Sequence, residues 1–380
     1  MTEPATLSAL DTPALLLERG KVEANAIRLG SHIAALGPQL RLHVKTAKSL
    51  EVTRLVQGDR PGPITVSTLK EAEEFAAHGY RDILYGVAFA PGKLPRAQAL
   101  VKAGVNLTIV IDSLEAANAI RAALKPGDPL LPVLVEIDCD GHRSGLKPAD
   151  PEIVAIARAL ASSQAPVRGV MTHAGDSYNC RSIDAIRAIA GRERDAVVAA
   201  ARRLRDAGFE APIVSVGSTP TATYAEDLTG VTEVRAGVFV FFDLVMAGIG
   251  VCRVEDIALS VLGTVIGHQR EKGWTLVDAG WMAMSRDRGT AKQPVDQGYG
   301  LVCDAAGKPI DGLIVSDASQ EHGILSHRSG DPARMPDLPI GTRVRILPNH
   351  ACATAAQYDR YRILSGTDRI EATWKRFSGW

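Results

Sequence analysis

The feature that most constrains the fold of this chain is a regular alternation between short β-branched segments and longer amphipathic segments over its first two thirds. Such an alternation is typical of βα units arranged around a parallel sheet. Eight segments have the composition of strands: Arg41–Lys45, Ile64–Thr68, Asp82–Val87, Asn106–Asp112, Leu131–Asp138, Val167–His173, Ile213–Gly217 and Glu233–Phe241. Helix-like segments lie between them, among them Lys70–His78, Leu94–Ala103, Ser113–Leu124, Pro151–Ser162 and Ile183–Ala207. Eight βα units predict an α/β fold built on a TIM-like (β/α)8 barrel.

The pattern changes after Cys252, where long helical segments give way to strand-like ones. The clearest of these are Ile257–His268, Trp274–Asp278 and Val344–Leu347. Because single cores stop growing at about 250 to 300 residues, a chain of 380 residues has room for a second domain. We therefore expect an N-terminal strand within residues 1–20 that pairs with either domain, a barrel over 21–250 and a mainly β C-terminal domain over 251–380.

Charge and cysteine content exclude several classes of protein. The chain has 43 basic and 43 acidic side chains, so it lacks the net positive charge that attracts nucleic acid or anionic lipid. The most apolar run, 237–251, is interrupted by Asp243 and is too short for a membrane span, so we expect it to form buried barrel wall. Five cysteines at long spacings do not suggest a disulfide framework, and the first ten residues lack a signal-peptide pattern. These features predict a cytoplasmic enzyme that acts on a small molecule, without a nucleic-acid or membrane partner.

Polar side chains collect where the predicted barrel strands end, and barrel active sites lie at that end. They include Lys45, Lys48, Ser67, Thr68, Asp138, His142, Arg143, His173 and the segment Ser215–Thr221. Lys45 closes an apolar strand, where a lysine either forms a Schiff base or is an ordinary surface residue. The segment Ser215–Thr221 is rich in hydroxyls and backbone N–H groups after a late strand, which suits either a phosphate site or a simple turn. Arg143 could bind an oxygen anion or be a solvated loop residue.

His350 and Cys352 form a candidate metal pair in the C-terminal part of the chain. They are two residues apart at the end of a strand-like run, and residues at that spacing on a strand face the same side. An imidazole and a thiolate suit Zn²⁺ or a similar ion, with other positions left for water or substrate. The alternative is a buried cysteine beside a hydrogen-bonded histidine.

Six motifs in order resemble the alanine-racemase-like, fold-type III pyridoxal-phosphate enzymes, and among them the branch of D-serine dehydratases and D-threonine aldolases. They are HVKTAKS (43–49), GHRSG (141–145), THAGDSY (172–178), VGSTPT (216–221), RAGVFVFFD (235–243) and PNHACAT (348–354). The resemblance covers both predicted domains. It departs from the usual pattern at Leu42, where relatives often have proline, and at Ala47, where many have histidine.

The resemblance implies a role for each matching residue. Lys45 would hold pyridoxal 5'-phosphate as a Schiff base and act as the base at Cα. Arg143 would contact the phenolic oxygen of the cofactor, and His173 and Tyr178 would line its ring. Arg235 stands where alanine racemases present an arginine to the pyridine nitrogen, although other members of the branch differ there. The phosphate would be held by Gly217, Ser218, Thr219, Gly237 and Val238, and a divalent Zn, Mn or Co ion by His350 and Cys352.

The implied activity is loss of water and ammonia from a 3-hydroxy D-amino acid, most readily D-threo-3-hydroxyaspartate to oxaloacetate, and also D-serine to pyruvate. D-Threonine aldolase is the nearest alternative, but aldolases of this branch typically have His-x-Asp where this chain has His350-x-Cys352. A racemase would need a second base, and a non-catalytic pyridoxal-phosphate carrier would consist of the barrel alone. A second substrate carboxylate would need a cation, for which Arg286, Arg288 and His142 are candidates unless they are solvated loop residues. Related enzymes are homodimers, so we expect a homodimer.

Overall fold

The computed structural model describes residues 6–366 and 368–380. The chain folds into two compact units. One unit, called the barrel unit below, comprises Ile27–Lys48, Gln57–Gly237 and Gly379–Trp380. The other, called the β unit, comprises the chain up to Ala26, Ser49–Val56 and Val238–Ser378.

The barrel unit contains a closed barrel of eight parallel strands, which confirms the predicted fold class. The strands are β2 (Gln39–His43), β3 (Ile64–Val66), β4 (Asp82–Ala88), β5 (Asn106–Ile111), β6 (Val133–Ile137), β7 (Val167–Thr172), β8 (Ile213–Val216) and β9 (Glu233–Ala236). The barrel closes where β2 pairs with β9, in a register that sets Leu42 beside Ala236. All eight strands run in the same direction, so their carboxyl ends meet at one mouth.

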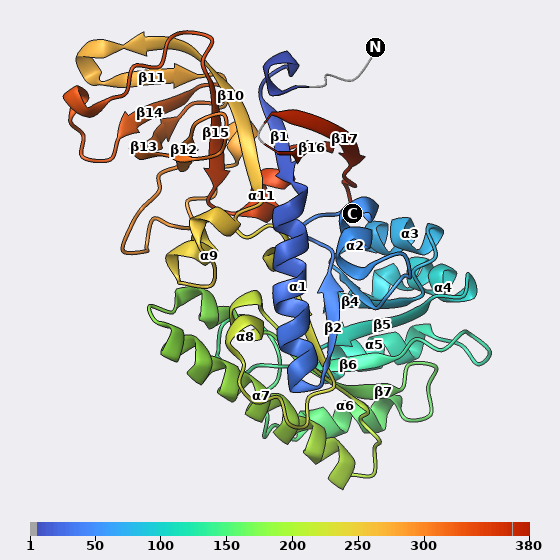
Figure 1. The fold of residues 1–380 in the computed structure, drawn as a ribbon. Helices are drawn as coiled ribbons and strands as arrows, with labels where there is room; N and C mark the ends of the chain where they lie inside the picture. The colour runs from blue at the N-terminus through green and yellow to red at the C-terminus, as the bar shows by residue number, and fades with distance from the viewer. Residues whose placement is uncertain (1–5, 367) are drawn as a thin grey trace. The chain divides into compact units, whose positions relative to one another are not determined.

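Helices follow the strands in the order expected for βα units (Figure 1). In chain order the first eight are α1 (Arg19–Leu36), α2 (Leu50–Gln57), α3 (Leu69–Ala77), α4 (Leu94–Lys102), α5 (Leu114–Ala123), α6 (Glu152–Leu160), α7 (Ile183–Asp206) and α8 (Thr219–Tyr224). Hydroxyl side chains set several of their starts: Thr68, Ser113 and Ser182 each accept the N–H of the residue three positions on, at α3, α5 and α7. Such caps satisfy N–H groups that have no partner within the helix.

A partly buried ion-pair network helps to close the barrel. Arg41 Nε on β2 lies 2.8 Å from Glu233 Oε2 on β9, and Arg41 Nη1 lies 2.8 Å from Asp82 Oδ1 on β4. Glu233 Oε1 also accepts a hydrogen bond of 2.6 Å from Ser215 Oγ on β8. Four of the eight strands are therefore joined by polar side chains as well as by the barrel's backbone hydrogen bonds.

The β unit is built on a nine-stranded sheet with the order β11-β14-β13-β12-β15-β10-β1-β16-β17, and β11 also pairs with β10. Its strands are β1 (Ala14–Glu18), β10 (Leu259–Gln269), β11 (Trp274–Val277), β12 (Gly300–Cys303), β13 (Pro309–Ala318), β14 (Gly323–His327), β15 (Arg343–Pro348), β16 (Arg360–Ser365) and β17 (Arg369–Lys375). Short helices α9 (Leu244–Gly248), α10 (Trp281–Met284) and α11 (Ala351–Ala355) complete it. Of the two pairings left open for the N-terminal strand, β1 adopts the one with the C-terminal sheet, between β10 and β16.

The structure corrects the end of the last predicted barrel strand. The segment expected to be one strand over Glu233–Phe241 is extended only as far as Ala236, and Val238–Val240 forms a turn of 3-10 helix. The whole segment is buried and therefore mostly apolar, and this composition is the same as that of a buried strand. The run 237–251 is likewise not barrel wall, because it continues into α9 of the β unit.

No helix within residues 6–366 and 368–380 is both long enough and apolar enough to cross a bilayer.

Candidate functional site

Lys45 lies in a turn two residues beyond the end of β2, at the barrel mouth. Its side chain is exposed, and among the described residues its ammonium has no ion-pair partner. The neighbouring Lys48 differs, because its Nζ lies 3.0 Å from the buried carboxylate of Glu71. Of the two lysines in the motif, Lys45 is therefore the one whose amine is available for chemistry.

His173 and Tyr178 lie beside each other beyond the end of β7. Their ring centroids are 6.2 Å apart, and His173 Nδ1 lies 2.7 Å from the carbonyl oxygen of Gly217. A carbonyl can only accept, so Nδ1 carries the proton and donates. The pKa of His173 is lowered to about 3, chiefly by burial and also by the charges of Lys45 and Arg235, against the raising effect of the Gly217 bond. The ring is therefore neutral, and suited to packing against a flat ligand rather than to donating a proton.

The loop after β8 has a tightly determined backbone. Gly217 has φ +154°, and a Cβ there would lie 2.0 Å from the carbonyl oxygen of Arg235, so only glycine fits. Its N–H already donates to Glu193 Oε1 at 3.0 Å. Ser218 caps α8, and its N–H donates to Thr221 Oγ1 at 3.3 Å.

These bonds narrow the choice of phosphate donors among the five residues predicted for that role. The N–H of Thr219 begins α8 and has no acceptor among the described residues. Gly237 directly follows β9, where a Cβ would lie 2.7 Å from the carbonyl oxygen of His43, and Val238 comes next in the chain. The N–H groups of Gly217 and Ser218 are thus already used, and phosphate binding by the predicted residues remains a prediction.

Arg235 and Arg143 differ in how firmly they are held. Arg235 is buried on β9, where its guanidinium donates to Ser215 Oγ and, at 2.5 Å, to the carbonyl oxygen of Thr172. Burial lowers its pKa, and the charges of three glutamates, Glu233 first, oppose that shift. Arg143 is 60% exposed and makes one ion pair of 3.4 Å with Glu136. It is therefore free to reorient toward a ligand, whereas Arg235 is fixed.

His350 and Cys352 follow β15, but not as a continuing strand. The strand ends at Pro348, His350 precedes α11, and Cys352 lies in the first turn of that helix. The prediction that strand alternation places them on one side is therefore wrong. They nevertheless meet, because their side chains are hydrogen-bonded to each other.

His350 and Cys352 remain the candidate pair for a divalent ion. His350 Nδ1 lies 2.6 Å from Asp287 Oδ2, so Nε2 is the nitrogen left for a metal. Burial lowers the pKa of His350, but the hydrogen bonds to Asp287 and Cys352 and the charge of Asp243 outweigh it and raise the pKa. Within the part of the chain that the structure describes, no group of three or more His, Cys, Asp or Glu side chains could hold an ion. If the pair binds an ion, it would supply two ligands and leave positions for water or substrate.

The three candidate cations for a second carboxylate each have a local contact. Arg288 pairs with Asp296 at 2.8 Å, and Arg286 lies 5.0 Å above the ring of Trp281. The ring of His142 packs against Gly175, where a Cβ would lie 2.2 Å from it. The role of these residues in binding a carboxylate remains a prediction.

Three acidic residues near these sites were missed by sequence reasoning. Glu193 is buried on α7 and accepts the N–H groups of both Ala174 and Gly217 at 3.0 Å. Asp243 is buried and accepts the N–H of Ala351 at 2.9 Å, beside His350. The third is Asp287. The sequence contained one signal for it, because Asp287 stands between the candidate residues Arg286 and Arg288.

Comparison with known proteins places the chain in a family. The family model described as alanine racemase, N-terminal domain, matches residues 17–245, and the putative serine dehydratase domain matches residues 258–364. The chain is 52% identical over 380 residues to D-threo-3-hydroxyaspartate dehydratase of Delftia sp. (strain HT23), covering 99% of both. It is 28% identical over 394 residues to D-serine dehydratase of Dictyostelium discoideum, covering 98% of both.

Solved structures agree with these matches. The structure of the dehydratase from Delftia sp. HT23 has a TM-score of 0.95 at 51% identity, covering 99% of this chain and 100% of that one. Two further structures are variants of a D-threo-3-hydroxyaspartate dehydratase, one with a histidine and one with a cysteine replaced by alanine, the latter in a metal-free form. The replaced residues are two positions apart, the spacing of His350 and Cys352. The chain therefore belongs to the alanine-racemase-like family of fold-type III pyridoxal-phosphate enzymes, in the branch that carries a serine dehydratase domain after the barrel.

Proposed function

We propose that this protein is a dehydratase that depends on pyridoxal phosphate and a divalent metal, and that it removes water and ammonia from a 3-hydroxy D-amino acid. The observation that carries the proposal is the 52% identity to D-threo-3-hydroxyaspartate dehydratase along 99% of both chains. The available amine of Lys45 and the pair His350-x-Cys352 support it, because the reaction needs both a cofactor lysine and a metal site.

We assign D-threo-3-hydroxyaspartate as the first substrate, with oxaloacetate and ammonia as products. D-Serine, which would give pyruvate and ammonia, is the second, since the chain also resembles D-serine dehydratase. In each reaction the Cα proton and the β-hydroxyl leave, and water then replaces the nitrogen, so that ammonia and a 2-oxo acid are formed.

Two groups from outside the chain supply chemistry that its side chains lack: pyridoxal phosphate accepts negative charge from Cα, and a divalent ion acts as a Lewis acid toward the β-oxygen. Lys45 Nζ would hold the cofactor covalently and, once displaced by the amine of the substrate, accept the proton from Cα. Arg143 would reorient to the phenolic oxygen, and the neutral ring of His173 and the ring of Tyr178 would pack against the cofactor. Arg235, held by Ser215 and Thr172, would present a fixed cation to the pyridine ring.

The remaining residues would hold the phosphate and the metal. We assign the phosphate to the N–H groups of Thr219, Gly237 and Val238, with Gly217 and Ser218 shaping the loop. His350 Nε2 and Cys352 Sγ would bind Zn²⁺, Mn²⁺ or Co²⁺, ions that accept mixed nitrogen and sulfur ligands. Arg286, Arg288 and His142 stay candidates for the second carboxylate, with a homodimer as the assembly and the cytoplasm as the compartment.

The test is an assay of the protein loaded with pyridoxal phosphate and, in turn, with each of the three ions. D-Serine, D-threonine and the stereoisomers of 3-hydroxyaspartate are the substrates, and ammonia, 2-oxo acid, glycine and aldehyde are measured separately. We expect ammonia and oxaloacetate in equal amounts from D-threo-3-hydroxyaspartate, with activity abolished by a chelator and restored by metal.

Two other results would each replace the proposal. Glycine and an aldehyde without ammonia would identify an aldolase. Cofactor binding without turnover of any 3-hydroxy D-amino acid would identify a carrier.

A further inference from the structure

Asp287 makes a contact with the candidate metal pair that nothing in the motifs predicts. Its Oδ2 lies 2.6 Å from Nδ1 of His350, although 63 residues separate them in the chain. An ionised carboxylate can only accept, so Nδ1 of the imidazole carries a proton, and Nε2 is the nitrogen left for a metal once any proton on it is displaced. A histidine bound to a metal characteristically donates its other ring N–H to a carboxylate or carbonyl in this way.

The carboxylate of Asp287 does not pair with the arginines on either side of it in the chain. Arg288, the next residue, forms its ion pair with Asp296 at 2.8 Å and stacks 4.9 Å from the ring of Tyr299. Arg286, the residue before, lies over Trp281. Both flanking arginines therefore contact other side chains, and the Asp287 carboxylate faces His350.

The backbone around Asp287 is held independently of its side chain. The buried amide of Asn349 donates from Nδ2 to the carbonyl oxygen of Asp287 at 3.4 Å and to that of Gly298 at 2.6 Å. The N–H of Asp287 donates to Ser285 Oγ at 3.2 Å, and Thr290 Oγ1 donates to Asn349 Oδ1 at 2.8 Å. The Asp287 side chain itself is 35% exposed. Removing the carboxylate should therefore leave the loop in place.

From these contacts we propose that Asp287 is a positioning residue for the metal: it fixes the tautomer and the ring orientation of His350 so that Nε2 is presented to the ion beside Cys352. The proposal rests on the proposed function only in requiring that His350 and Cys352 bind a metal. It follows that Asp287 contributes to the affinity for the metal, and that this contribution can be measured separately from any effect on the reaction.

The test measures the affinity for Co²⁺ by competition with a chromophoric chelator, and records the Co²⁺ absorption spectrum, in the protein loaded with pyridoxal phosphate. We expect Asp287→Ala to weaken Co²⁺ binding about 10- to 100-fold and to shift the metal spectrum. Asp287→Asn, which keeps an oxygen that can accept from Nδ1, should recover part of the affinity. Asp296→Asn is the matched control, because it removes a carboxylate from the same region that pairs with Arg288 instead; its Co²⁺ affinity should stay within about twofold of wild type. Thermal unfolding of the apoproteins should be the same for all four proteins.

Unchanged Co²⁺ affinity in Asp287→Ala, with a normal affinity in wild type, would overturn the role of Asp287 and leave the proposed function standing. Equal weakening by Asp287→Ala and Asp296→Asn would also overturn it, since the effect would then come from general charge. A wild-type protein that bound no Co²⁺ would overturn the metal site itself and, with it, this proposal.

Discussion

At the scale of single residues, the barrel mouth holds two histidines that stay neutral in the folded protein. Burial is the largest cause of the low pKa of both His43 and His173, and nearby positive charges lower both further. His173 has a pKa of about 3, against an ordinary value of 6.5. Since the unfolded chain takes up a proton on this residue near pH 6.5 and the folded one does not, folding becomes less favourable as the pH falls.

Replacing His173 should therefore reduce the acid sensitivity of the cofactor-free protein. The contribution of His173 to stability is fully present above pH 6.5 and is lost as the pH falls from there to about 3. In this window the free energy of unfolding falls as the pH falls. The fall per pH unit should be about 1.4 kcal/mol smaller in His173→Asn than in wild type. Urea unfolding at several pH values in the window measures the two slopes. Equal slopes would mean that His173 takes up its proton in the folded state.

Lys45 is the residue on which cofactor attachment depends in the proposed mechanism. Lys45→Ala should abolish the absorbance band of the lysine-bound cofactor, because no other described lysine is proposed to reach it. Borohydride reduction followed by mass spectrometry of the peptides should place the cofactor on Lys45 in wild type. Lys147→Ala, which removes an exposed lysine paired with Asp138, is the control and should keep the band. Attachment at another lysine would reject the assignment.

At the scale of elements, one side chain of α7 joins the loops that follow β7 and β8. Glu193 Oε1 accepts the N–H of Ala174 from one loop and that of Gly217 from the other, both at 3.0 Å. Hydroxyl contacts reinforce the link, since Ser177 Oγ lies 2.9 Å from Ser218 Oγ. Burial raises the pKa of Glu193, against its hydrogen bonds, which lower it. The loops that carry the candidate ring and phosphate contacts are therefore held as one body by a residue outside every recognised motif.

Loss of this link should be measurable in both stability and cofactor affinity. Glu193→Ala leaves two buried N–H groups without an acceptor, each worth about 1–3 kcal/mol, so we expect destabilisation of about 3 kcal/mol or more. Pyridoxal-phosphate binding should weaken as the loops separate. Glu193→Gln, which keeps an acceptor oxygen, should be milder, and the exposed Glu210→Ala should be neutral. Urea unfolding and cofactor titration test this, and wild-type values in Glu193→Ala would refute it.

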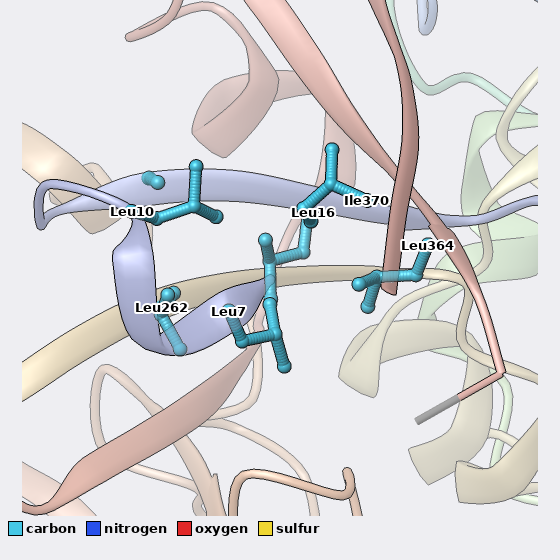
Figure 2. Packing of buried hydrophobic residues seen from close by; sticks show 7 residues of the cluster. Leu7, Leu10, Leu16, Leu262, Leu364 and Ile370 are labelled. Carbon is cyan, nitrogen blue, oxygen red and sulfur yellow. The ribbon is translucent and has the colours of Figure 1, made fainter. Parts of the chain in front are cut away.

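At the scale of the whole molecule, the N-terminal segment belongs to the β unit. The strands with which it pairs there lie more than two hundred positions later in the chain. β1 is an interior strand of the sheet, antiparallel to β10 and parallel to β16. Figure 2 shows the apolar cluster that forms around it. Its members come from the first residues of the chain and from three late strands: Leu7, Leu10, Ala14, Leu16, Leu262, Leu364 and Ile370.

Truncating the centre of this cluster should destabilise the β unit. Leu16 is 0% exposed, and Leu16→Ala should lower the free energy of unfolding by about 3 kcal/mol, from lost burial and the cavity left behind. Ile340→Ala is the control within the same unit, since Ile340 is 70% exposed and should cost little. Chemical unfolding followed by circular dichroism compares them. A similar small loss in both variants would show that the N-terminal strand contributes little to the sheet.

The sequence predicted the barrel well because each βα unit has a local signature. Seven of the eight predicted strands match the observed ones with small shifts at the ends. The segment predicted for β9 is five residues longer than the observed strand. That error arose because the run after Ala236 is as apolar as a strand, and only the pairing partners in three dimensions decide where a strand stops. The predicted pairing of His350 with Cys352 rested on strand alternation, but a helix start brings them together instead.

The repeated βα architecture, the family and the reactive groups follow from the amino-acid sequence alone, because periodicity and motif order are properties of the chain read locally. Only the tertiary structure shows which N–H groups of the loop after β8 already have acceptors, which sheet receives β1, and that Glu193 and Asp287 contact residues of the candidate sites. These features depend on contacts between residues far apart in the chain: 24 positions from Glu193 to Gly217, 63 from Asp287 to His350, and 246 from Leu16 to Leu262. Hydrogen bonds and apolar contacts between such residues exist only once folding has brought them together, so a local sequence pattern does not predict them.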